Sequence, residues 1–329
     1  MNFAFAGTPE FAAWVLRDLA ERGRRPSFVV TQPDRPCGRG RKVAPPPVAS
    51  VAECLGIECI QTGDINSGEV LAKLRDEAVP ALVVAAFGQM LKPPLLDSVL
   101  CLNIHASLLP SYRGAAPIER ALAAGEERVG VTIMRITERL DEGPWALQKA
   151  VSVSLRDDAG SVGRMLALAG AIGIDQVIHG LSDGTVTWSE QTSPGTLYAE
   201  KIRACDCALD TERGAKTVHD QVRSLSPVVG ARASSGGLEF KVWRTWPYGQ
   251  EGLDPVPAAC GGVAGRPGKI STEGGRFFVG CTEGALEIIA LQPVGKAVMT
   301  AAAFLRGYQK RLSDRLDRTD GEGRPSCDD

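Results

Sequence analysis

The sequence contains few histidines, few aromatic residues and no long apolar run. Its apolar stretches, such as residues 79–87, have the length of a strand and fall far short of the roughly 18 to 20 residues that cross a bilayer. The first residues, MNFAFAG, are typical of a strand and lack the layout of a secretory leader. We therefore expect a cytoplasmic protein without a membrane partner.

Two motifs of nucleotide binding and acyl transfer are also missing. AGTPEF at residues 6–11 has only Gly7 where a dinucleotide site needs G-x-G-x-x-G, which disfavours a Rossmann oxidoreductase. The stretch instead predicts a helix start, with Thr8 as N-cap and Pro9 at the first helical position. Without a G-x-S-x-G elbow or an evident Cys–His pair, a covalent acyl-enzyme has no candidate nucleophile. Direct transfer between bound substrates is favoured.

Charge and cysteine content limit the partners and metal sites that the chain can have. The net charge of −2 does not indicate a polyanion partner, but residues 35–42, RPCGRGRK, form a local basic run without one acid. The nine cysteines are scattered and odd in number, which is typical of reduced, buried residues. Cys205 and Cys207 offer only two thiolates where a structural zinc takes four ligands, so we predict no metal site.

The segment pattern predicts an α/β protein of two domains. Up to about residue 180, short apolar runs alternate with helix-like segments, which predicts a mostly parallel, doubly wound sheet in a domain spanning 1–185. A polar stretch with Pro and Gly at 186–203 is interpreted as a linker. Residues 204–313 show shorter strands and frequent turns, typical of a small β-barrel, with a helix near 214–224. The tail at 314–329 is predicted to be disordered.

A candidate site lies in NIHASLLPSYRG. Side chains alternate along a strand, so Asn103 and His105 should share one face at the carboxyl end, where ligands bind in such sheets. ITERLDEGPWA places Asp141 in a loop after another strand, expected at the same edge. The residues leave two interpretations open: a catalytic set for acyl transfer, or a core histidine with a capping acid. His179 and His219 fall within helices and are interpreted as solvated or packing residues.

These motifs resemble those of enzymes that use 10-formyltetrahydrofolate. NIHASLLPSYRG matches their N-x-H-x-S-L-L-P-x-x-x-G signature, and LDEGP is similar to their L-D-x-G loop. FAGTPEFA, TQPDRPCGRGRKVAPPPV, TLYAEKI and LQPVGKAVMTAAAFLRG narrow the resemblance to the methionyl-tRNA formyltransferase family, over residues 2–312.

The resemblance implies a fold and a set of functional residues. It implies a Rossmann-like formyltransferase domain followed by a small OB-like β-barrel that binds tRNA, in a monomer with initiator methionyl-tRNA and 10-formyltetrahydrofolate as substrates. By motif, the implied catalytic residues are Asn103, His105 and Asp141. The implied folate-binding residues are Ser107, Leu108, Leu109 and Pro110, together with Gln89 and Met90. The implied tRNA-binding residues are Arg35, Arg39, Arg41 and Lys42.

Two alternatives remain, and the chain departs from the family in places. A formyltransferase acting on an amino sugar or glycinamide ribonucleotide would share the signature, but would need neither the basic run nor a tRNA-sized second domain. A non-catalytic tRNA-binding protein could keep the same fold. The departures are the Cys-Asp-Cys at 205–207, the missing aromatic, Pro-rich stretch at 225–237, and the acidic tail.

Overall fold

The computed structural model describes residues 1–37, 42–192 and 195–317, arranged as two compact units. Unit 1 comprises Met1–Pro117, Arg128–Ser152 and Val162–Glu200. Unit 2 comprises Ile118–Glu127, Val153–Ser161 and the chain from Lys201 onward. The domain boundaries proposed at residues 185, 203 and 313 stay predictions.

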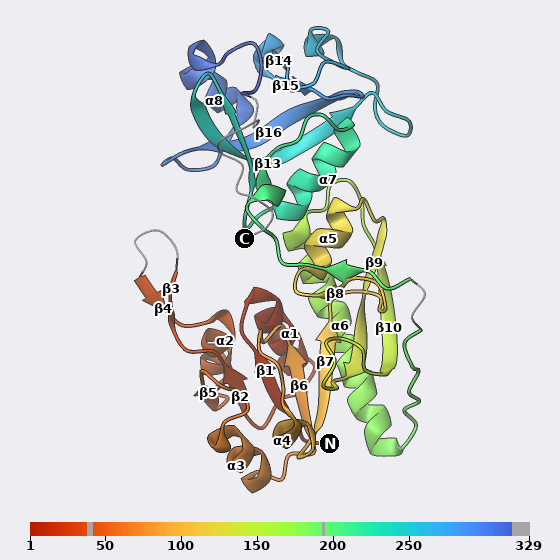
Figure 1. Cartoon of the computed structure of the whole chain (residues 1–329). Coiled ribbons are helices and arrows are strands. Elements are labelled where there is room, and N and C mark those ends of the chain that lie inside the picture. The colour runs from red at the N-terminus through yellow and green to blue at the C-terminus, as the bar shows by residue number, and fades with distance from the viewer. Residues whose placement is uncertain (38–41, 193–194, 318–329) are drawn as a thin grey trace. The chain divides into compact units, whose positions relative to one another are not determined.

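Unit 1 is built on a seven-stranded, mostly parallel sheet (Figure 1). In spatial order its strands are β10 (Trp145–Ser152), β9 (Arg128–Arg135), β7 (Leu100–His105), β6 (Ala81–Ala85), β1 (Ala4–Gly7), β2 (Val29–Thr31) and β5 (Cys59–Gln61). Neighbours from β7 to β5 pair in parallel, whereas β9 is antiparallel to β7, and β10 to β9. The doubly wound fold class is confirmed.

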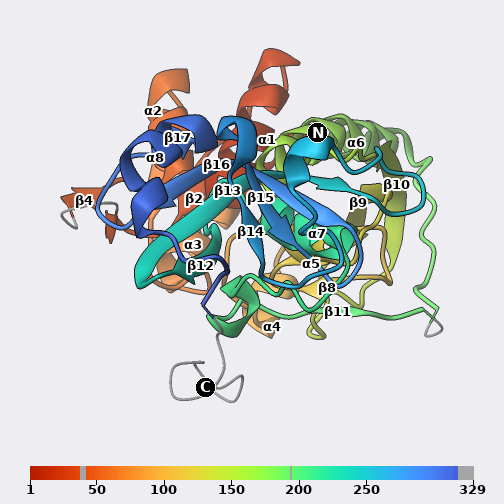
Figure 2. The same ribbon diagram turned by 90° about the horizontal axis from the view of Figure 1, so that it is seen from above.

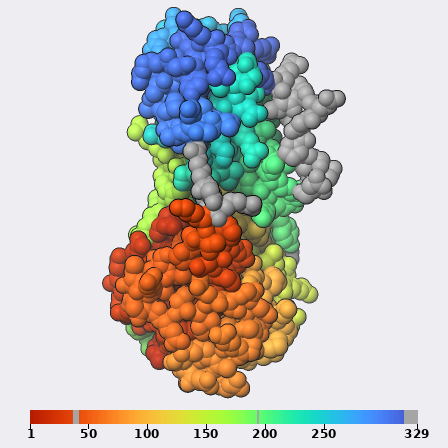
Figure 3. All heavy atoms as spheres, turned by 90° about the vertical axis from the view of Figure 1, so that its left-hand side faces the viewer, coloured from red at the N-terminus to blue at the C-terminus, as the bar shows by residue number. Residues whose placement is uncertain are grey.

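Both faces of this sheet are buried, and strand alternation divides their side chains. In β1, Phe5 packs in one apolar cluster with α1 (Glu10–Glu21), α2 (Pro47–Leu55) and α6 (Ala159–Asp183). Its neighbours Ala4 and Ala6 pack in the other cluster, with α3 (Gly68–Asp76) and α4 (Pro93–Leu96). In the space-filling view, the N-terminal part of the chain, red to orange, forms one closely packed surface (Figure 3).

α1 starts one residue later than the sequence predicts. The helix begins at Glu10, and Pro9 holds the N-cap position without a side-chain cap. The Thr8 hydroxyl donates to the Phe87 carbonyl oxygen at 3.4 Å, so the N-cap assignment for Thr8 was wrong. The residue instead ties the end of β1 to the chain that follows β6.

α6 is long and apolar enough, by length and composition, to cross a membrane, with a mean hydropathy of 1.3 over its most apolar window. A core helix has the same composition, and half of that window is buried. A Cβ at Gly170 would lie 2.6 Å from Ile104 Cγ2, and one at Gly173 would lie 3.2 Å from Ile133 Cγ1. The two glycines therefore let α6 pack tightly on β7 and β9.

Unit 2 contains a curled antiparallel sheet, which confirms the expected OB-like domain. Its strands are ordered β12 (Ala231–Ser235), β13 (Leu238–Tyr248), β16 (Ala285–Pro293), β15 (Phe277–Gly280) and β14 (Ile270–Ser271), with β17 (Met299–Thr300) also paired to β16. The long strands β13 and β16 lie side by side (Figure 2). Register shifts near Arg244 in β13 are bulges, which bend a strand and allow a sheet to curl.

Helices and short elements complete both units. Unit 2 has α7 (Ala215–Leu225), close to the predicted 214–224, and α8 (Ala301–Tyr308), and both pack on the apolar side of its sheet. Its shorter helices are α5 (Pro117–Ala123), η1 (Cys205–Cys207), η2 (Ala258–Cys260), η3 (Glu273–Gly275) and η4 (Gln309–Arg311). Unit 1 adds two small ladders: β3 (Arg35–Cys37) with β4 (Lys42–Ala44), and β8 (Arg113–Gly114) with β11 (Tyr198–Ala199).

Candidate active site

The two polar residues of β7 lie on one face of the strand, as predicted. Leu102 and Ile104 belong to the cluster under α6, and Cys101 belongs to the opposite cluster. Asn103 and His105 have the parity of Cys101, because successive side chains point to opposite faces. The strand thus delivers an amide and an imidazole to the carboxyl edge of the parallel strands.

The side chain of Asp141 lies close to both Asn103 and His105. Its carboxylate oxygens lie 3.5 Å from Asn103 Nδ2 and 3.7 Å from His105 Nδ1. Because β9 is antiparallel to β7, it runs away from the carboxyl edge, and Ile136 N donates to the Cys101 carbonyl oxygen. The loop then turns back, so Asp141 lies in a loop after a strand and at the same edge as Asn103 and His105, as the sequence predicts.

The imidazole is fixed through one nitrogen and faces the acid with the other. His105 Nε2 lies 2.9 Å from the Tyr112 carbonyl oxygen, and since that oxygen can only accept, Nε2 carries the hydrogen. Nδ1 is directed at Asp141 Oδ2, which also accepts from the Gly114 backbone N–H at 2.9 Å. The side chains of His105 and Asp141 are only 6% and 10% exposed, so water screens this pair weakly.

Backbone strain marks the same place. Four non-glycine residues have positive φ among those described, and two of them are Tyr112 at 60° and Asp141 at 53°. Tyr112 presents its carbonyl to the imidazole, and Asp141 presents its carboxylate. Left-handed conformations of such residues cost about 1 to 3 kcal/mol each and concentrate at functional sites.

The SLLP loop, residues 107–110, is held by side chains of the two antiparallel strands. The Thr132 hydroxyl of β9 donates to the Ser107 carbonyl and accepts from the Leu109 N–H. Gln148 of β10 donates to the Leu109 carbonyl at 2.7 Å. A Cβ at Gly130 would lie 2.5 Å from Leu108 Cδ2, so this glycine makes room for the loop. The Leu109–Pro110 peptide bond is cis.

The other two predicted folate residues differ in what their side chains do. The Gln89 amide is engaged with the backbone of the loop before α3, since it accepts from Ile65 N–H and donates to the Gly63 carbonyl. Met90 is 51% exposed. Met90 therefore has the freer side chain for a ligand.

The two ends of the predicted basic run belong to strands β3 and β4, which pair antiparallel and project from unit 1 (Figure 1). Arg35 and Lys42 are exposed and belong to these two strands. Lys42 pairs with Cys37, which has the same parity as Arg35, so both cations are on one face of the hairpin. Arg39 and Arg41 lie outside the described residues.

Comparisons with known proteins identify the family. A family model described as "Formyl transferase" matches residues 1–178, and one described as "Formyl transferase, C-terminal domain" matches residues 201–309. The protein named methionyl-tRNA formyltransferase from Rubrobacter xylanophilus is 43% identical over 94% of this chain and 97% of its own length. The protein of that name from Methylococcus capsulatus is 38% identical over 94% and 97%. The chain belongs to the methionyl-tRNA formyltransferase family.

Solved structures of other formyltransferase-like proteins share the fold. HypX from Aquifex aeolicus in complex with tetrahydrofolic acid superposes with a TM-score of 0.64, at 14% identity over 97% of this chain. The chain spans about half, 50%, of that protein's length. WlaRD, a sugar 3N-formyltransferase, has a TM-score of 0.60, at 14% identity over 90% of this chain and 99% of its own.

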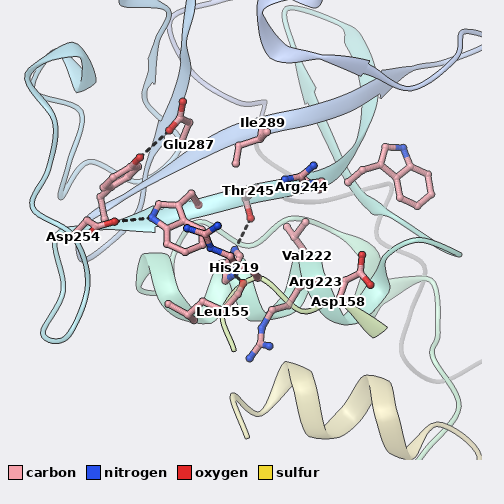
Figure 4. Close-up of a pocket in the computed structure, with 14 residues that line it drawn as sticks. Leu155, Asp158, His219, Val222, Arg223, Arg244, Thr245, Asp254, Glu287 and Ile289 are labelled. Carbon is pink, nitrogen blue, oxygen red and sulfur yellow. Dashed lines mark hydrogen bonds between the residues drawn. The ribbon is translucent and has the colours of Figure 1, made fainter. Parts of the chain in front are cut away.

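A cavity of about 400 Å³ in unit 2 of this formyltransferase family member contains none of the predicted catalytic residues (Figure 4). His219 lines it, and both its ring nitrogens are engaged: Nδ1 with the Thr245 hydroxyl at 2.9 Å and Nε2 with the Leu155 carbonyl at 2.8 Å. Burial lowers the pKa of His219, while the hydrogen bond to Leu155 acts in the opposite direction. The predicted packing role of His219 is confirmed.

Residues 205–207, Cys-Asp-Cys, where the chain departs from the family, make structural contacts. Asp206 forms a bidentate ion pair with Arg120, at 3.0 and 2.8 Å, which holds the pKa of that carboxyl below its usual range against the effect of burial. Cys207 is buried and its thiol contacts the Arg203 carbonyl. Within residues 1–37, 42–192 and 195–317, no three metal-ligating side chains gather.

Sequence reasoning missed two residues that contact the Asp141 loop. Arg113 of β8 is buried and donates to Gln191, which in turn donates to the loop backbone. Gln191 lies in the stretch interpreted as a linker, and a single Gln in polar surroundings carries no signal of this role.

Proposed function

We propose that this chain transfers the formyl group of 10-formyltetrahydrofolate to the α-amino group of methionyl initiator tRNA. The observation that carries the proposal is that relatives named methionyl-tRNA formyltransferase are 36–43% identical over at least 93% of this chain, both units included. The convergence of Asn103, His105 and Asp141 supplies the chemistry.

The donor set fits a formyl group. The α-amine attacks the formyl carbon, the bond from that carbon to N10 of the folate breaks, and the proton that the amine loses balances the proton that N10 gains. Negative charge develops on the formyl oxygen, where fixed N–H donors stabilise a transition state most. The Asn103 amide and the His105 imidazole are such donors, and they lie on the same face of β7.

The bond between His105 and Tyr112 indicates which ring nitrogen acts. Because Nε2–H is engaged with the Tyr112 carbonyl, we assign the donation to Nδ1, which faces Asp141 and carries a hydrogen when the imidazole is protonated on both nitrogens. The carboxylate stabilises a proton on Nδ1 and accepts the amine proton, directly or through a water molecule. The Gly114 N–H holds that carboxylate in place.

We assign folate binding to Ser107, Leu108, Leu109 and Pro110, together with Gln89 and Met90. The support is the rigid attachment of the SLLP loop to Thr132 and Gln148, which presents a fixed backbone to a ligand. The exposed thioether of Met90 suits contact with an aromatic ring.

We assign tRNA binding to the basic hairpin and to the second domain, residues 204–313. Arg35 and Lys42 on one hairpin face offer positive charge to a phosphate backbone, and the sequence between them adds Arg39 and Arg41. The protein is proposed to act as a monomer in the cytoplasm, with the domain boundaries given by the sequence.

One assay tests the proposal. Purified protein is incubated with 10-formyltetrahydrofolate and charged initiator tRNA, and N-formylmethionine is measured after hydrolysis of the ester. Elongator methionyl-tRNA, free methionine, an amino sugar nucleotide and glycinamide ribonucleotide serve as competing acceptors. Formylation of a small amine in preference to tRNA would replace the proposal with the first alternative, and no formylation of any acceptor would favour the non-catalytic one.

A further inference from the structure

The segment that follows α6 is part of unit 1, and it is anchored at two places. Ser189 exchanges two backbone hydrogen bonds with Trp145, both at 2.9 Å, at the start of β10. Further on, β11 pairs in parallel with β8, with Tyr198 opposite Arg113 and Ala199 opposite Gly114. Gln191, two residues after the first anchor, lies beside the Asp141 loop.

Gln191 uses its side-chain amide to hold that loop. Its Nε2 donates to the backbone carbonyls of Asp141 and Gly143, each at 2.8 Å. Its Oε1 accepts from Nε and Nη2 of Arg113, at 3.1 and 2.8 Å. The guanidinium can only donate and the carbonyls can only accept, so the opposite orientation of the amide would lose all four bonds.

The hydrogen bonds of Gln191 and Arg113 lead to the candidate acid, Asp141. Arg113 is buried, and its Nη1 also pairs with Glu142 at 3.3 Å, on the same loop. The next residue, Gly114, gives its N–H to the Asp141 carboxylate. Asp141 is thus held at its side chain by β8 and at its main-chain oxygen by Gln191, while its φ of 53° is one the backbone disfavours.

We propose that Gln191 is a positioning residue for formyl transfer, which acts by fixing the Asp141 carboxylate against His105 Nδ1. The inference rests on the catalytic role proposed for Asp141. Without the amide, the loop loses both bonds to its carbonyls, and the strained residue relaxes away from the imidazole. A displacement of about 1 Å at a reacting group costs about 100-fold in rate.

The test combines two substitutions with a thermodynamic cycle. Gln191→Met keeps the length of the side chain and removes every polar contact, whereas Gln191→Glu keeps an acceptor for Arg113 and removes the donor to the loop. Both should lower kcat by about 10- to 100-fold, with the KM for folate and for tRNA little changed. In an Asp141→Asn background, Gln191→Met should change kcat by less than about threefold, since residues that act as a unit are not additive.

Gln221→Met is the matched control. That amide also donates to two backbone carbonyls, those of Asp206 and Ala208, at 2.9 and 2.7 Å, but in unit 2. It should lower the unfolding temperature as Gln191→Met does, and any effect that it has on kcat should multiply with that of Asp141→Asn, because its bonds are to residues of unit 2.

Three outcomes would overturn the inference. Full activity of both Gln191 variants beside an impaired Asp141→Asn enzyme would remove Gln191 alone from the mechanism. Losses that multiply in the double variant would show a general structural role. Full activity of Asp141→Asn would instead defeat the proposed role of Asp141, and with it this inference.

Discussion

Replacing Asp141 with Asn isolates one charge in the candidate site. The two side chains have the same shape, and the Asn oxygen can still accept from the Gly114 N–H. What is lost is the negative charge 3.7 Å from His105 Nδ1, and with it the oxygen that faces Asn103 Nδ2 and the group that accepts the amine proton. The substitution therefore separates the electrostatic contribution of the carboxylate from its contribution to the loop structure.

The expected magnitude follows from this distance. When the imidazole carries both protons, it and the carboxylate are two unit charges 3.7 Å apart, which interact by about 4 to 5 kcal/mol at an effective dielectric constant of about 20. Without that carboxylate the proton on His105 Nδ1 is no longer stabilised, and the loss of one fixed oxyanion donor costs about 3 to 4 kcal/mol of barrier, or about 100- to 1,000-fold in kcat. The charge interaction acts through this donor, so the two values are not added. We expect turnover of Asp141→Asn to fall by about 100- to 1,000-fold.

Single-turnover formylation with both substrates saturating is the appropriate assay, because it reports the chemical step and not product release. His105→Ala should fall by a similar factor. The affinity for methionyl-tRNA, measured by filter binding at fixed salt, should stay at the wild-type value in both variants. Unchanged thermal unfolding would establish that the fold is intact.

A decrease of less than about tenfold in both variants would refute the reasoning, because a donor that contributes so little does not stabilise the transition-state charge. A large decrease accompanied by lost tRNA binding would also count against it. In that case the residues would shape the binding surface.

Two further predictions concern tRNA binding and pH. Arg35→Ala and Lys42→Ala should each weaken tRNA binding and reduce the slope of its salt dependence by about 1, with folate affinity unchanged; an unaltered slope would contradict the hairpin assignment. The pKa of His219 is lowered in the folded protein, so the unfolded chain binds the proton first as pH falls below about 6.5, and the free energy of unfolding should then decrease by at most about 1.4 kcal/mol per pH unit. His219→Gln should remove this part of the pH dependence in urea titrations at pH 7.5, 6.5 and 5.5, whereas His179→Gln, at an exposed position, should retain it.

The sheet could be predicted because the strand pattern is local. Residues 81–85 are apolar at every position, which predicts burial on both faces, and the structure divides them between two clusters by alternation. The direction of β9 could not be predicted in this way. Its partner is chosen by contacts distant in sequence, and an alternating apolar strand is equally compatible with parallel and antiparallel neighbours.

The candidate site likewise has a part that local sequence predicts and a part that depends on contacts distant in sequence. The shared face of Asn103 and His105 follows from a spacing of two residues within one strand. Asp141 comes close only because a loop reverses, and Gln191 reaches that loop from 50 residues further along the chain. No periodicity or turn signal encodes such a contact, so the polar composition around Gln191 gave no indication of this role.

The strained backbone at Tyr112 and Asp141 depends on contacts with residues distant in sequence. Each residue adopts a positive φ that an unconstrained chain disfavours. Each also makes a hydrogen bond that depends on that conformation: the Tyr112 carbonyl oxygen accepts from His105, and Asp141 Oδ2 accepts from the Gly114 N–H. The opposing forces come from β8, β11 and Gln191, all outside the two strained residues. A loop with relaxed backbone would need no such support, but it would also leave the carboxylate free to move. The structure therefore indicates that the cost of strain, about 1 to 3 kcal/mol per residue, is offset by contacts whose main effect is to keep one acid facing one imidazole.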